Sequence, residues 1–145
     1  MDNIIIKRFW QDVDFFQIDI VCKSEYITAH GKVYTSDALI DELYSAIDSF
    51  LAKNESTVCW NNGPLGNLMT PNMSFVFSYK DNLGHIQIEV FMEIDDGKTA
   101  SYHNCCFYVN TEMGLLYQFK ENLLKLKTPQ LGIQISLNEQ ETNQE

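Results

Sequence analysis

The chain has 145 residues, with 20 acidic side chains against 10 basic ones and a formal net charge of −10. Its hydrophobic share of 45% and aromatic share of 12% exclude an intrinsically disordered protein. We therefore expect one folded domain over residues 1–137, followed by a disordered polar tail at 138–145. The negative charge disfavours nucleic acid and anionic membranes as partners and favours a basic protein.

The beginning of the chain does not resemble a secretory signal, because Asp2 is acidic and the apolar run that follows is short. No uncharged apolar stretch approaches the roughly 20 residues that a membrane helix needs. The four cysteines lack CxxC spacing, as expected for reduced thiols in the cytosol. The sequence therefore predicts a cytoplasmic protein.

Alternation of apolar and polar residues predicts three strands in the first third of the chain, at residues 4–7, 16–21 and 26–34, with a hairpin turn at 23–25. A helix is predicted over 36–51, because Ser36 can cap its start and apolar residues recur at i, i+3 and i+4 behind it.

The second half begins with a predicted loop at 61–72, which is rich in Asn, Gly and Pro. Strands are predicted at 73–79 and 86–93 around a turn at 80–84, and at 99–109 after the tight turn at Asp96 and Gly97. Thr111 is predicted to cap a second helix over 112–127, and residues 130–137 to add a short edge strand. The predicted fold is α+β: an antiparallel sheet of about six or seven strands with two helices packed on one face.

Catalytic and cofactor motifs are missing from the sequence. It has no GxSxG elbow, no glycine-rich nucleotide loop and no histidine pair at metal-ligand spacing, so we expect neither an enzyme nor a bound metal or cofactor. A hydrolase would need His103 or His85 beside Cys105 in a cleft, and core packing is the competing interpretation of Cys105.

Acidic residues and one tryptophan are the candidates for partner binding. The acids lie on the outer face of the first predicted helix and along the strand and turn near residues 89–96, where a charge run is either a solvated face or a docking surface. Trp60 is either a binding anchor or a core residue. The candidate set is Asp41, Glu42, Asp48, Trp60, Glu89, Glu93, Asp95 and Asp96.

Three stretches together resemble the WapI-type immunity proteins of bacteria. These are residues 31–34 leading into 36–43, Trp60 with its glycine-containing loop followed by 75–79 and 81–90, and 107–110 leading into the helix that ends at 126. The resemblance implies a protein that neutralises a cognate contact-dependent toxin, typically nuclease-like, by direct contact. Such toxins are often basic, so an acidic inhibitor can match their charge.

The alternative interpretation is a small-ligand-binding or regulatory domain without catalysis. It predicts an apolar pocket between sheet and helix near Trp60.

Overall fold

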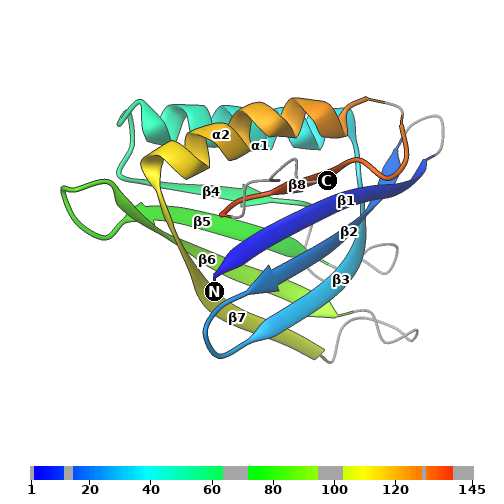
Figure 1. The fold of residues 1–145 in the computed structure, drawn as a ribbon, viewed down its shortest axis with the longest axis horizontal. Helices are drawn as coiled ribbons and strands as arrows, with labels where there is room; N and C mark the ends of the chain where they lie inside the picture. The colour runs from blue at the N-terminus through cyan, green and yellow to red at the C-terminus, as the bar shows by residue number, and fades with distance from the viewer. Residues whose placement is uncertain (1, 12–14, 64–71, 95–102, 129, 139–145) are drawn as a thin grey trace, which may run out of the picture.

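Two four-stranded antiparallel sheets and two helices make up the computed structural model, which describes residues 2–11, 15–63, 72–94, 103–128 and 130–138 (Figure 1). The first sheet has the order β3-β2-β1-β8 and the second the order β4-β5-β6-β7. The strands are β1 (Asn3–Gln11), β2 (Phe16–Lys23), β3 (Thr28–Thr35), β4 (Thr57–Asn61), β5 (Met73–Tyr79), β6 (His85–Ile94), β7 (His103–Glu112) and β8 (Gln134–Ser136).

The prediction of α+β structure with antiparallel strands is confirmed, whereas the single sheet is wrong. The chain leaves the first sheet after β3, crosses through α1 (Asp37–Leu51) and starts the second sheet at β4. It leaves the second sheet after β7 through α2 (Met113–Leu126) and returns to pair β8 with β1. Alternation shows which side of a strand is buried but not which strand lies beside it, so this division could not be read from the pattern.

The helices begin and end close to the predicted residues. Ser36 caps α1 by accepting a hydrogen bond from the Leu39 backbone nitrogen at 3.3 Å. The prediction that Thr111 caps α2 is wrong: Glu112 occupies the cap position without a side-chain cap bond. Thr111 instead donates to Asn138 Oδ1 at 2.7 Å. A side chain drawn away to another segment cannot satisfy the first turn of a helix.

The two helices lie side by side on one side of the molecule, with both sheets below them in Figure 1. Helix α1 contacts β4 of the second sheet, and α2 contacts β8 of the first and β7 of the second. The helices therefore contact both sheets at one side of the molecule, whereas the sequence predicts that they pack on one face of a single sheet.

The core lies between the two sheets and under the helices, and both sheets contribute alternate side chains to it. Phe50 of α1 stacks on Tyr79 of β5 with ring centroids 4.3 Å apart. Gly31 of β3 lies against Met92 of β6, where an added Cβ would stand 2.9 Å from the Met92 methyl carbon. The two sheets thus approach closely at this glycine.

The end of the described chain is tied to its beginning. The Leu137 backbone nitrogen donates to the Ile4 carbonyl at 2.9 Å, and the Asn138 backbone nitrogen donates to Asn3 Oδ1 at 2.8 Å. Asn138, predicted as the first residue of the disordered tail, is therefore held by hydrogen bonds. Residues 139–145 lie outside the described part of the chain, as do the turn predicted at Asp96 and most of the loop predicted at 61–72.

A candidate protein-binding surface

The second sheet has one side turned to the core and one side turned away from it. We call the second side the outer face. Its residues alternate along β4 to β7 with the buried ones. They are Thr57, Cys59, Asn61, Ser74, Val76, Ser78, His85, Gln87, Glu89, Phe91, Asn104, Cys106, Tyr108, Asn110 and Glu112. Uncharged polar, aromatic and apolar side chains predominate, and the carboxylates among these fifteen residues are Glu89, midway along β6, and Glu112, at the end of β7.

Glu89 and Tyr108 lie opposite each other midway along β6 and β7, the last two strands of the second sheet. The Tyr108 hydroxyl donates to Glu89 Oε2 at 3.1 Å, and 49% of Tyr108 remains exposed. This hydrogen bond and the negative charge of Glu89 raise the pKa of Tyr108. An exposed tyrosine held by a carboxylate combines an aromatic contact area with negative charge, a combination suited to a cationic partner.

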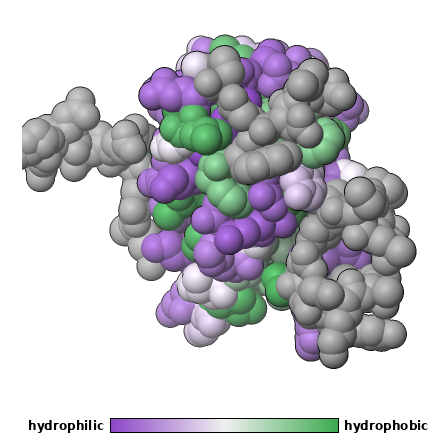
Figure 2. Space-filling view, turned by 90° about the vertical axis from the view of Figure 1, so that its right-hand side faces the viewer, coloured by the Kyte–Doolittle hydropathy of each residue, from purple (hydrophilic) through white to green (hydrophobic). Residues whose placement is uncertain are grey.

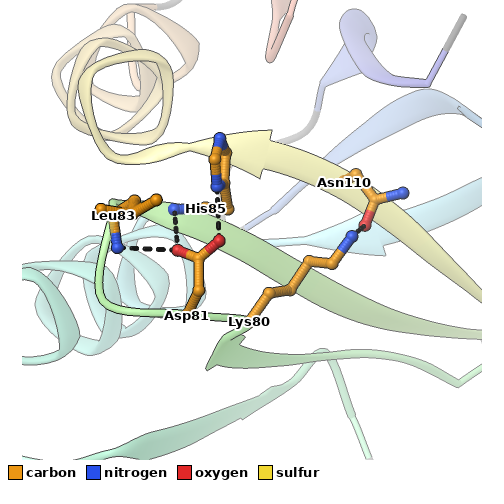
Figure 3. Close-up of polar contacts among 5 residues, drawn as sticks. All are labelled: Lys80, Asp81, Leu83, His85 and Asn110. Atoms are coloured by element: carbon orange, nitrogen blue, oxygen red, sulfur yellow. Dashed lines mark hydrogen bonds and ion pairs between the residues drawn. The ribbon is translucent and has the colours of Figure 1, made fainter.

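The turn between β5 and β6 borders the outer face and is fixed by Asp81 (Figure 3). The Asp81 carboxylate accepts hydrogen bonds from the Leu83 backbone nitrogen at 2.8 Å and from His85 Nδ1 at 2.6 Å. These bonds, the one from His85 first, lower the pKa of Asp81. Lys80 extends across the sheet and donates to Asn110 Oδ1 at 3.1 Å. The polar groups at this end of the outer face therefore stabilise the turn.

Glu93 was predicted to point outward with Glu89, but the structure buries it. Only 7% of Glu93 is exposed, and its Oε1 accepts a hydrogen bond from the Asn72 backbone nitrogen at 2.7 Å. The Glu93 backbone nitrogen donates in turn to the Asn72 carbonyl at 2.9 Å. Both Met92 and Glu93 are buried, so the regular alternation of β6 ends here. The Glu93 carboxylate therefore stabilises the fold and is not accessible to a partner.

Of the three candidate acids on α1, Asp41 and Asp48 pair with lysines and Glu42 does not. Lys127 Nζ lies 2.7 Å from Asp41 Oδ1, and Lys120 Nζ lies 2.8 Å from Asp48 Oδ1. The hydrogen bond with Asp41 is the main cause of the raised pKa of Lys127. Both carboxylates are therefore offset by a lysine. Glu42 is exposed and, within the described residues, has no ion pair.

Lys120 is the most buried of these lysines, with only 5% of its side chain exposed. Its ammonium group lies 3.4 Å from Glu121 Oε2 and over two aromatic rings, 4.4 Å from the Tyr117 centroid and 5.1 Å from that of Tyr44. Burial by itself would lower the pKa of Lys120, but the hydrogen bond and the charge of Asp48 outweigh it, so the pKa is raised. Lys120 therefore remains charged and connects α1 to α2.

Trp60 is a core residue, which is one of the two interpretations that the sequence allows. It is 4% exposed, its ring packs against Phe75 at a centroid distance of 5.5 Å, and its Nε1 donates to the Leu39 carbonyl at 3.0 Å. The ring is thus inaccessible to a partner in this conformation. Asp95 and Asp96, also in the candidate set, lie outside the described residues.

A shallow hollow of about 420 Å³ opens to solvent beside the β5–β6 turn, away from Trp60. Its lining is part polar and part apolar and consists of Lys53, Glu55, Ser56, Tyr79, Asp81, Asn82, Gly84 and Met113. Among the described residues, no three His, Cys, Asp or Glu side chains are grouped closely enough to hold a metal ion. Burial, and secondarily Cys106, raises the pKa of Cys105, the reverse of what an activated thiol nucleophile requires.

Comparisons with family models, with curated proteins and with solved structures found no match to this chain. Within the described part of the chain, neither α1 nor α2 is long and apolar enough to cross a membrane.

Proposed function

We propose that this protein is an immunity protein that neutralises a cognate bacterial contact-dependent toxin by binding it directly. The resemblance of three sequence stretches to WapI-type immunity proteins suggests this function. The observation that carries it is the outer face, where Tyr108 and Glu89 form an exposed aromatic and acidic centre on a chain of net charge −10. A surface of this kind attracts a basic, nuclease-like partner and needs no catalytic group.

Among the candidate acids that the structure describes, Glu89 and Glu42 are neither buried nor paired with a lysine, and this favours them as the proposed contact. Asp41 and Asp48 are paired with Lys127 and Lys120, and Glu93 is buried, so these three contribute less negative field at the surface. In the face seen in Figure 2, hydrophobic and hydrophilic residues are interspersed, and the described residues form no broad apolar area there. On the outer face, the carboxylate of Glu89 and the exposed ring of Tyr108 favour recognition by charge and an aromatic anchor.

The test is a kinetic measurement with a basic toxin domain, and a toxin gene immediately upstream would be the first source of it. Replacing Glu89 with Lys reverses the charge beside Tyr108 on the outer face, so association should slow several-fold and its salt dependence should weaken. The matched control is Glu25→Lys, because Glu25 is exposed in the β2–β3 turn, remote in sequence from the second sheet, and the change in net charge is the same. Equal association rates for both variants and the unchanged protein would exclude the outer face.

The alternative function, binding of a small ligand, would use the hollow beside the β5–β6 turn. Small-molecule sites are mostly apolar and enclose their ligand, whereas this hollow opens to solvent and its lining is part polar. It also lies away from Trp60, where the sequence interpretation placed a pocket. We therefore do not propose a ligand for it.

A further inference from the structure

The four strands at the edges of the two sheets differ in how they are protected from pairing with another chain. β8 is only three residues long, and β4 is short and packs against α1. β3 carries the exposed polar side chains of His30 and Lys32. Short length, covering elements and charged side chains are the usual devices that block an edge. β7 is ten residues long and has no Asp, Glu, Lys or Arg from His103 to Thr111.

The backbone of β7 presents hydrogen-bonding groups along this edge. The Asn110 backbone nitrogen donates to Asp2 Oδ2 at 2.8 Å, and the Asn110 carbonyl accepts from Asn138 Nδ2 at 2.8 Å. Both groups therefore point away from β6. Because backbone groups alternate along a strand, those of Asn104, Cys106 and Tyr108 point the same way. Among the described residues, none of these three makes a backbone hydrogen bond at the edge.

We propose that β7 pairs in antiparallel fashion with β7 of a second copy of this chain. The pairing stops at Asn110, whose edge groups are already occupied, and is centred on Cys106, which lies opposite Cys106 of the other copy. Asn104 then lies opposite Tyr108. The second sheet of one copy and the second sheet of the other then form one continuous sheet around a two-fold axis.

A second copy fits this edge better than a strand of the basic toxin. A neutral edge offers a basic strand no electrostatic advantage, whereas a second copy supplies an edge of the same length that ends at the same blocked residue. Although each copy carries a net charge of −10, the opposed side chains are all uncharged, so the register places no like charges directly opposite one another. This inference does not rest on the proposed function, although both involve the part of β7 that carries Tyr108.

Sedimentation equilibrium of the full chain under reducing conditions tests the proposal. The expected result is a reversible dimer of twice the 16.8 kDa chain mass, which dissociates on dilution. Cys106→Lys places two positive charges opposite each other and should raise the dissociation constant of the dimer about tenfold or more. Cys59→Lys is the matched control, because Cys59 is also an exposed cysteine of the outer face but lies on β4, and it should leave the dimer intact.

Cross-linking of the folded protein with a short bis-maleimide gives a second measurement that does not depend on the lysine variants. A cross-linked dimer should form in the Cys59→Ser variant and be lost in the Cys106→Ser variant. A monomer at every concentration, equal weakening by both lysine variants, or a cross-link that requires Cys59 would each overturn the proposal.

Discussion

The contact between Lys120 and Asp48 offers a direct test of how α1 and α2 are held together. Replacing Asp48 with Ala removes the closest carboxylate, at 2.8 Å, and leaves an ammonium group that is 5% exposed with Glu121 at 3.4 Å. A hydrogen bond to a charged group contributes about 1.5–3 kcal/mol when both partners are shielded. The Asp48 side chain is 60% exposed, so solvent screening reduces the expected loss to about 1–2 kcal/mol.

The assay is urea unfolding near neutral pH, supported by the melting temperature, which should fall by about 2–8 °C. Lys120→Met should lower the free energy of unfolding by less, about 1 kcal/mol or below. The methionine side chain keeps the packing against the tyrosine rings, and the two carboxylates that lose their partner are accessible to solvent. Glu42→Ala on the same helix is the control and should change stability by less than about 0.5 kcal/mol.

The pH dependence of this contact follows from the raised pKa of Lys120. Its contribution to stability is fully present below the pKa of an unfolded lysine and is lost as the pH rises through the folded value. The loss caused by Asp48→Ala should therefore be constant across neutral pH and shrink only in strongly alkaline solution. If Asp48→Ala left stability unchanged, or Lys120→Met cost more than Asp48→Ala, the role assigned to this ion pair would be refuted.

Three further predictions concern a buried carboxylate, a turn and a thiol. Glu93→Ala should lower the free energy of unfolding by about 1–3 kcal/mol, because the Asn72 N–H loses its acceptor, and Glu93→Gln should cost less; equal losses would contradict this role. The hydrogen bond from His85 lowers the pKa of Asp81, so ionised Asp81 stabilises the fold above its unfolded pKa. In urea unfolding, the stability lost by Asp81→Asn should therefore vanish as the pH falls through the pKa of Asp81 in the folded protein. A loss of stability that persists in acid would disprove this role. Burial raises the pKa of Cys22, so Ellman's reagent should modify the two exposed cysteines in the folded protein and Cys22 only after unfolding.

Local patterns in the sequence predicted the helices and most of the strands. The apolar spacing behind Ser36 predicted α1, and the alternation from Met73 to Tyr79 predicted β5. β4 was not predicted as a strand, because its five residues are too few for alternation to stand out. The division into two sheets was missed because strand order depends on contacts between segments that are distant in sequence.

The candidate site shows the same limit at the level of single side chains. Asp41 and Asp48 are exposed acids, as the helical pattern indicates, but their pairing with Lys127 and Lys120 could not be predicted, because only the fold brings these distant segments together. The alternating pattern of β6 places Glu93 on the same side as Glu89, but the alternation ends before Glu93, and its side chain is buried. Glu89 remained on the surface because the alternation holds at its position.

The pairing of β8 with β1 has a consequence for how the chain matures on the ribosome. The first sheet gains its fourth strand only when residues 134–136 have been synthesised, so the edge of β1 that pairs with β8 stays uncovered until then. Contacts that join such distant segments slow folding, and the nascent chain exposes a pairing-competent strand in the meantime. The same closeness of residues 3 and 138 makes the protein a natural subject for circular permutation, with new ends opened in an exposed turn such as the one at Glu25.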